Sequence, residues 1–307
     1  MGIFKYKTYP TDCTEVKVLK PKFGPAGNSD SFYQEGFSAS VDMPKWLAAR
    51  ELDAFEYSFG RGIRLGTEGA KAIGAEAEKY GIQMSVHMPY FINLATEEDE
   101  KKIKNIGYFA DSLKVAEALG AKRAVFHPGS ASGGDRGAIL QRAKGFFKEI
   151  IATLDDMGLM GKVTLCAETM GKINQLGSLD EVIELCNVDE RIWPAIDFGH
   201  LHCRGLGAIN GREDYAAILD RLESGVGTER TRTMHVHFSR IEYTKGGEKM
   251  HHTFADVQYG PEFMPLAELV AERGYEPVFI CESKGTMAED AKSMKDMYFS
   301  AINSLLK

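Results

Sequence analysis

The sequence lacks the features that mark secreted or membrane-spanning proteins. Its five cysteines are an odd, scattered set without a CxxC pair: Cys13, Cys166, Cys186, Cys203 and Cys281. This pattern indicates free thiols in a reducing compartment rather than a disulfide framework. No apolar run reaches 18 residues, and the opening MGIFKYKTYP has neither a secretory h-region nor the Ser or Thr of a myristoylation signal. We therefore expect a cytoplasmic protein with no membrane partner.

The sequence also lacks the excess of positive charge that attracts nucleic acid to a whole molecule. Lys and Arg number 37 against 44 Asp and Glu, a formal net charge of −7. A nucleic-acid partner would need a locally positive face, which bound metal ions can supply. With 307 residues, 44% hydrophobic and 26% charged, the composition is that of a soluble globular protein and excludes a disordered chain or a coiled coil. No linker or low-complexity segment divides the chain.

Two textures alternate along the chain. Short runs rich in Val, Ile, Phe and Tyr predict strands at 17–25, 53–59, 82–89, 123–129, 162–170, 191–200, 231–240 and 276–283. Amphipathic segments predict helices at 67–81, 97–120, 136–158, 178–186, 214–224, 261–274 and 287–306. Ser178 and Glu181 form a capping box, and Gly81, Gly120 and Gly274 stand just past helix ends. The pattern predicts an α/β protein, a single-domain (β/α)8 TIM barrel over 1–307 with an irregular N-terminal extension at 1–16. A doubly wound sheet is the main rival, but no Gly-rich phosphate turn supports it.

Side chains of the kinds that bind metals stand at the ends of six consecutive predicted strands. In chain order they are His87, His127, Glu168, Asp197 with His200, His235, and Glu282. They are spaced by about one strand–helix unit, so a barrel brings them to a common C-terminal rim. Imidazole and carboxylate are ligands of zinc and related divalent metals. One ion needs only three or four of them, so their number predicts a cluster of two or three ions.

Some choices among these residues stay open. His237 and His202 lie two positions from His235 and His200, so either can replace its neighbour, and His252 stands beside His251 in the same way. A lone histidine or glutamate in a strand is more often a satisfied polar residue than a ligand. The run of six strand ends is what favours a metal centre.

Six short segments contain most of these candidate ligands: HMPYFINL (87–94), FHPGS (126–130), AETMG (167–171), DFGH (197–200), MHVHFS (234–239) and CES (281–283). They resemble the signature segments of the endonuclease IV family, the metal-dependent apurinic/apyrimidinic endonucleases within the xylose-isomerase-like TIM barrels. FGPAGN (23–28) and SFGRGIR (58–64) are similar to an endonuclease IV-related branch that is common in archaea.

The resemblance implies a role for each ligand. It assigns His87, His127 and bridging Glu168 to a first zinc, Glu168, Asp197, His235 and Glu282 to a second, and His200 and His251 to a third. The family has an Asp two residues before this last histidine; here that position is Lys249, and the nearest acid is Glu248. Tyr90 stands where the family places an aromatic ring against damaged DNA. The family's basic loop after the second strand has no clear match, and only Arg61 and Arg64 can serve there.

The function implied is hydrolysis of DNA on the 5′ side of abasic sites in base excision repair, with two or three zinc ions, or manganese in part. Metal ions can generate hydroxide and neutralise the phosphate, and either Glu168 or Glu282 can orient the nucleophile. An alternative is a sugar isomerase or epimerase of the same superfamily, with one divalent ion on Glu168, Asp197, His235 and Glu282 and the two glutamates moving a proton. A metal-dependent binding protein without turnover is a third reading. No protein partner is inferred.

Overall fold

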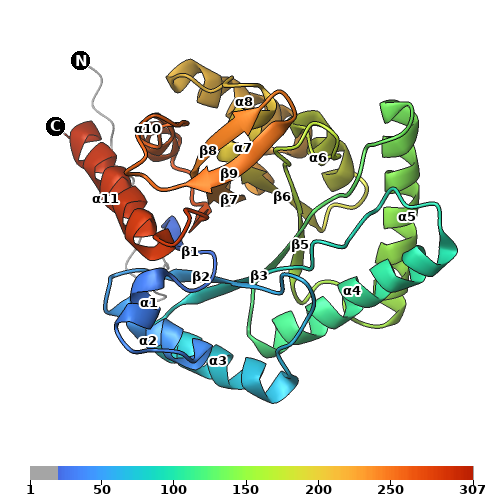
Figure 1. The fold of residues 1–307 in the computed structure, drawn as a ribbon, viewed down its shortest axis with the longest axis horizontal. Helices are drawn as coiled ribbons and strands as arrows, with labels where there is room; N and C mark the ends of the chain where they lie inside the picture. Colours follow the sequence, from blue (N-terminus) through green and yellow to red (C-terminus); the bar gives the residue numbers. More distant parts are fainter. Residues whose placement is uncertain (1–19, 307) are drawn as a thin grey trace, which may run out of the picture.

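Eight parallel strands form a nearly closed barrel in the computed structural model, which describes residues 20–306 (Figure 1). The strands are β1 (Lys22–Pro25), β2 (Ala54–Ser58), β3 (Gln83–His87), β4 (Arg123–Phe126), β5 (Thr164–Glu168), β6 (Ile192–Asp197), β7 (His235–Phe238) and β10 (Val278–Cys281). They are bonded in the order β1-β10-β7-β6-β5-β4-β3-β2. Between the two edge strands, the amide of Gly27 donates to the carbonyl of Glu56 (2.9 Å) and that of Asp53 to the carbonyl of Phe23 (3.0 Å). The predicted TIM barrel is confirmed.

Helices surround the barrel. They are α1 (Asp30–Gln34), η1 (Ser40–Asp42), α2 (Met43–Ala48), α3 (Thr67–Tyr80), α4 (Asp99–Ala118), α5 (Arg136–Asp156), α6 (Leu179–Cys186), α7 (Phe198–Arg204), α8 (Arg212–Val226), α9 (Thr228–Arg232), α10 (Met264–Arg273) and α11 (Met287–Leu305). The apolar core lies between helices and strands. For example, α5 buries Phe146, Phe147 and Ile150 on one face, and Phe147 packs against Phe126 of β4. The Ser178 capping box is present at the start of α6.

The N-terminal region differs in part from the sequence prediction. The predicted strand 17–25 is observed as the shorter β1, and the predicted extension 1–16 lies outside the described residues. Across residues 20–306, no helix has the length and hydropathy needed to cross a membrane. The cysteines of the same range are buried free thiols: Cys166, Cys186, Cys203 and Cys281.

A β-hairpin that the sequence analysis did not predict follows β7. Its strands are β8 (Arg240–Thr244) and β9 (Gly247–His252). Its tip is bonded to the loop after β5, because Glu248 N–H donates to the carbonyl of Gly171 (3.3 Å) and Ile173 N–H to that of Gly246 (3.1 Å). Gly247 has φ +90 at this contact, and a side chain there would overlap the carbonyl of Gly171. The hairpin is therefore fixed over the C-terminal end of the barrel.

Gly24 is where the sheet closes, and its substitution is expected to destabilise the protein. A Cβ atom on Gly24 would overlap the carbonyl group of Ala54 on β2. Gly24→Ala must push β1 away from β2, so we expect the free energy of unfolding to fall by about 3 kcal/mol. Gly107→Ala in α4 is the control, because nothing lies within 4 Å of the added methyl group there. In urea denaturation, Gly107→Ala should be as stable as wild type or more stable by up to about 1 kcal/mol. Equal stability of Gly24→Ala and Gly107→Ala would contradict the prediction.

Candidate metal centre

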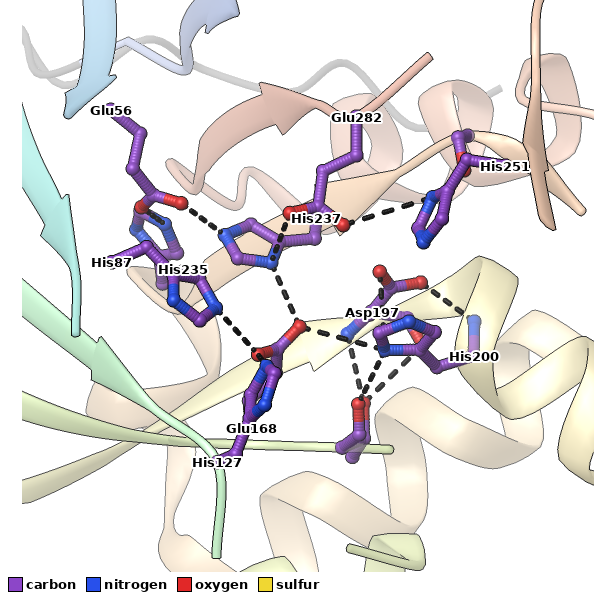
Figure 2. Close-up of polar contacts among 12 residues, drawn as sticks. Glu56, His87, His127, Glu168, Asp197, His200, His235, His237, His251 and Glu282 are labelled. Carbon is purple, nitrogen blue, oxygen red and sulfur yellow. Dashed lines mark hydrogen bonds and ion pairs between the residues drawn. The ribbon is translucent and has the colours of Figure 1, made fainter. Parts of the chain in front are cut away.

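The predicted ligands converge at the C-terminal end of the barrel (Figure 2). His87, Glu168 and Asp197 are the last residues of β3, β5 and β6, His127 and Glu282 directly follow β4 and β10, His200 lies in α7, and His251 lies in β9. Parallel strands present their carboxyl ends at one face of the barrel, which is why residues far apart in the sequence meet. They surround a cavity of about 720 Å³ whose lining includes Tyr90 and the imidazoles of His87, His127, His200 and His251.

Glu168 is the hub of this arrangement. Its Oε2 atom lies 3.1 Å from Nε2 of His87 and 3.0 Å from Nε2 of His127. Its Oε1 atom lies 2.9 Å from Nδ1 of His237 and 3.5 Å from Nδ1 of His200. The side chain is 1% exposed. One carboxylate oxygen thus faces His87 and His127, and the other faces His237 and His200. This is the geometry expected of a bridging ligand.

Asp197 and Glu282 complete the carboxylate set. Asp197 Oδ1 accepts the backbone N–H of His200 (2.7 Å), whereas its buried Oδ2 atom has no hydrogen-bond partner among the described residues and lies 3.3 Å from Nδ1 of His200. A buried carboxylate oxygen without a hydrogen bond is costly unless a cation meets it. Glu282 lies 3.5 Å from His237 and 3.8 Å from His251. The donor set and the oxygen without a hydrogen bond fit a divalent metal centre.

Of the four groups of ligand atoms in residues 20–306 that are close enough to hold a metal ion, three are linked by shared carboxylates. They are His87, His127 and Glu168; Glu168, Asp197, His237 and Glu282; and His200, His251 and Glu282. Glu168 is common to the first two groups and Glu282 to the last two. The residues can therefore hold ions in a connected row in which each shared carboxylate joins two neighbours.

His237, rather than the predicted His235, lies in this centre. His235 is the first residue of β7, not near its end, so it sits one layer deeper, level with Ala195 of β6. His237 is level with Asp197 on the same face of β7. His235 instead contacts Glu56 of β2, with Nε2 and Oε2 2.9 Å apart. Of the two histidines that the sequence analysis left open on this strand, His237 is therefore the one that lies with Glu168, Asp197 and Glu282.

The structure places the other two open alternatives, His202 and His252, outside these ligand groups. His202 accepts the amide of Ile209 through Nδ1 (3.2 Å) and lines a separate pocket. His252 stacks on Tyr259 with ring centroids 4.0 Å apart. Neither ring belongs to a metal-holding group, whereas His200 and His251 share one.

The pairing of the two hairpin strands sets the positions of Glu248 and Lys249. Lys249 occupies the position at which the resembling family has an aspartate, and Glu248 is the nearest acidic residue. The pairing of β8 with β9 shifts, so Glu242 pairs with Met250 and Tyr243 with Glu248, leaving Lys249 as the extra residue of a bulge. The bulge turns both Glu248 and His251 toward the cavity. Glu248 lies 3.6 Å from Nε2 of His200 and 3.8 Å from Nε2 of His251. Lys249 is exposed and pairs with Glu242 instead (2.6 Å).

Glu248 is accordingly expected to support the ion held by His200 and His251. Glu248→Gln should weaken binding of that ion by at least about tenfold, the lower end of what losing a ligand's hydrogen-bond partner costs. Lys249→Asp is the matched control, because the ammonium group of Lys249 pairs with Glu242 and belongs to no group of possible ligands. Metal content measured by mass spectrometry after dialysis checks this. A higher content in Lys249→Asp would mean that the carboxylate is needed at that position instead.

Burial and close charges shift the pKa values of these groups. Burial works to raise the pKa of Glu168, but the imidazoles of His237 and His127 outweigh it and lower the pKa well below its ordinary value. Burial raises the pKa of Glu282, and the charges of Glu168 and Asp197 add to this rise. Burial alone would lower the pKa of His87, yet its contacts with Glu168 raise it to about 9. The centre thus contains one strongly anionic carboxylate and one that holds a proton more readily, an asymmetry typical of catalytic sites.

The predicted substrate contacts lie at different distances from the cavity. Tyr90 lines it, is 52% exposed, and stacks on His127 with ring centroids 6.1 Å apart. Arg61 and Arg64 are exposed on the loop after β2 and do not line the cavity. That loop touches Tyr90 through the carbonyl of Gly60 (3.2 Å). The wall of the cavity thus includes the predicted Tyr90 but neither predicted arginine.

Sequence analysis did not identify Glu56, which lies beneath the predicted ligands. Glu56 lines the cavity, is fully buried, and forms a further group of possible ligands with His235 and His237. The available signal was a lone charged residue in the otherwise hydrophobic or neutral run AFEYSF at 54–59. A buried carboxylate in a strand needs partners, and these come from β3 and β7.

Comparison with known proteins agrees with this architecture. The sequence profile described as "Xylose isomerase-like TIM barrel" matches residues 44–298. The chain belongs to this family. An uncharacterized protein of Methanocaldococcus jannaschii is 36% identical over 231 residues, covering 75% of this chain and 80% of that protein. A probable endonuclease 4 of Staphylococcus carnosus is 27% identical over 241 residues, covering 76% and 77%.

Solved structures show the same fold with two different activities in their names. Endonuclease IV from Thermus thermophilus superposes with a TM-score of 0.68 at 22% identity, covering 92% of this chain and all of that one. A D-tagatose 3-epimerase-like protein superposes with a TM-score of 0.69 at 19% identity, covering 93% and 100%. At these identities the likeness concerns the fold alone, so the activity has to be argued from the site.

Proposed function

We propose that this protein is a metal-dependent phosphodiester hydrolase that cleaves DNA on the 5′ side of abasic sites. The observation that carries this proposal is the row of three ligand groups joined by Glu168 and Glu282. A single-ion sugar isomerase needs only the group of Glu168, Asp197, His237 and Glu282. It leaves the groups built from His87 and His127, and from His200 and His251, without a purpose. The distant similarity to probable endonuclease 4 proteins points the same way.

The rim of the cavity supports a substrate with phosphate groups. Lys172, from the loop after β5, and Lys284, after β10, are exposed and line the cavity. In residues 20–306 neither has a carboxylate partner within ion-pair distance, unlike Lys249. A neutral sugar makes no use of such cations, whereas a phosphodiester backbone is held by them. Because the protein is acidic overall, this local positive charge is what would hold the DNA over the centre.

The chain's own residues divide the work as follows. Bound zinc or manganese ions would lower the pKa of a water molecule and neutralise charge on the phosphate. His87, His127, His237 and Asp197 would hold these ions. Glu168 and Glu282, each shared between two groups, would fix their spacing and orient the attacking oxygen. The exposed ring of Tyr90 would pack against the extruded abasic nucleotide, which has no paired base to separate.

A sugar epimerase remains the second candidate, favoured by one specific observation. Glu168 and Glu282 face each other across the group that includes Asp197 and His237, and their pKa values are pushed in opposite directions. Such a pair can remove and return a proton next to a carbonyl. The ligand predicted as His235 in this alternative is His237.

The test is incision of a duplex that carries one stable abasic-site analogue. Protein loaded with zinc or manganese should cut on the 5′ side of the lesion, and chelated protein should not. An undamaged duplex of the same sequence is the control for lesion recognition. No incision by protein with measured metal content would contradict the hydrolase and move the epimerase, tested on ketohexoses, to first place.

A further inference from the structure

Beneath the metal centre, Glu56 forms a polar cluster that stands apart from the three groups linked by Glu168 and Glu282. Glu56 from β2, together with His235 and His237 from β7, is fully buried. Figure 2 shows Glu56 and His235 on the side of His237 away from Glu168. The cluster therefore lies behind one ligand of the centre and in direct contact with it.

The carboxylate of Glu56 contacts the hydroxyl of Ser85 and the imidazoles of His235 and His237. Its Oε2 atom accepts the hydroxyl of Ser85 (2.9 Å) and lies 2.9 Å from Nε2 of His235. Its Oε1 atom lies 2.9 Å from Nε2 of His237, at ion-pair distance but without hydrogen-bond alignment, and neither atom has a hydrogen-bond partner among residues 20–306. Ser85 is level with Glu56 in the pairing of β2 and β3. Two of the contacts thus hold the carboxylate in place, and the third faces the ligand.

His237 is oriented differently from His87 and His200. His87 pairs its Nδ1 with the carbonyl of Met88 (2.9 Å) and turns Nε2 toward Glu168. His200 pairs its Nδ1 with the carbonyl of Thr169 (2.9 Å) and turns Nε2 toward Glu248. In His237 the nitrogens are exchanged, since Nδ1 faces Glu168 and Glu282 and Nε2 faces away.

Because of this exchange, His237 does not pair with a backbone carbonyl as His87 and His200 do. The Nε2 atom of His237, which faces away from Glu168, points toward β2 on the other side of the barrel. A side chain has to supply its hydrogen-bond acceptor there, and Glu56 is the one in reach. A neutral imidazole carries one N–H, so an acceptor at Nε2 leaves the lone pair on Nδ1 free for a metal ion. Carboxylates that accept from a ligating histidine fix its ring and make it a stronger ligand.

We propose that Glu56 is a positioning residue that holds His237 with its proton on Nε2, and that Ser85 and His235 hold Glu56 in turn. The proposal rests on the metal centre of the proposed function, but it applies equally whether the ions serve a hydrolase or an epimerase. Loss of the carboxylate should lower metal affinity at the His237 group by about 10–100-fold, the usual cost of losing such a partner.

Cobalt titration of metal-free, full-length protein tests this without reference to any substrate. We compare wild type with Glu56→Gln, Glu56→Asp and Ser85→Ala, following visible absorption bands of the bound Co²⁺ and, separately, thermal unfolding of the metal-free forms. Glu149→Gln on the exposed face of α5 is the matched control for the change of residue type. Glu56→Gln should weaken one class of cobalt sites and alter its spectrum, Glu56→Asp should retain part of the affinity, and Ser85→Ala should have the smallest effect.

The outcomes separate this proposal from the proposed function. Cobalt affinity and spectrum equal to wild type in Glu56→Gln would overturn it, as would a variant whose only defect is a lower melting temperature. If wild type binds cobalt and Glu56→Gln does not, but neither cuts abasic DNA, the positioning role stands and the hydrolase fails. A wild type that binds no cobalt would overturn both.

Discussion

Glu168→Gln is expected to reduce metal-dependent cleavage of abasic DNA by about 1,000-fold, which corresponds to roughly 4 kcal/mol of transition-state stabilisation. Both oxygens of Glu168 are engaged: one faces His87 and His127, the other His237 and His200. An amide keeps the volume of the side chain but replaces one anionic oxygen with an NH₂ group, which cannot coordinate a cation. One of the two neighbouring groups must therefore lose a ligand.

Metal content should fall with the activity. Inductively coupled plasma mass spectrometry of purified Glu168→Gln is expected to show at least one ion fewer than wild type. Glu149→Gln, an exposed substitution on α5, should keep wild-type content and rate. Full activity of Glu168→Gln with unchanged metal content would show that Glu168 does not bridge two ions.

His237→Ala is expected to remove the ion shared with Asp197 and Glu282 and to lower the cleavage rate by at least about 100-fold, because a ligand is lost and not merely oriented less well. His237 is fully buried and is the ligand that β7 contributes to this group. The variant should therefore bind one ion fewer, while the group of His87 and His127 keeps its own.

His235→Ala is the comparison that distinguishes the two histidines of β7. It lies on the same face of the strand and is equally buried, but it contacts Glu56 and none of the carboxylates of the centre. We expect it to keep the wild-type number of ions, with a lower melting temperature because its removal leaves a cavity. The reverse ranking in metal content would return the ligand role to His235.

Much of the fold could be predicted because its signals are local. The amphipathic period of 97–120 and 136–158 reappears as α4 and α5, and Ser178 with Glu181 forms the capping box of α6. Such patterns depend on neighbours three or four residues away, so they can be recognised from the sequence alone. The hairpin β8–β9 had no comparable signal, since it is held in part by hydrogen bonds to the loop after β5.

The residues of the candidate metal centre could be predicted in part. Residues at strand ends, such as His87 and Asp197, were identified because a barrel brings every strand end to one rim. The choice between His235 and His237 was not, because both lie on one face of β7 and only the stagger of the strands decides which is level with Asp197. The direction of Glu248 likewise depends on a bulge in the pairing of two strands.

The sequence by itself determined that this chain alternates strands and helices and carries imidazoles and carboxylates at the strand ends. Its tertiary structure alone decided which of them lie close enough to share an ion, that Glu168 and Glu282 each belong to two groups, and that Glu56 stands behind His237. The physical reason is that ligand sharing depends on close approach between atoms of different strands. Those distances follow from the register and closure of the barrel, which residue spacing along the chain does not specify.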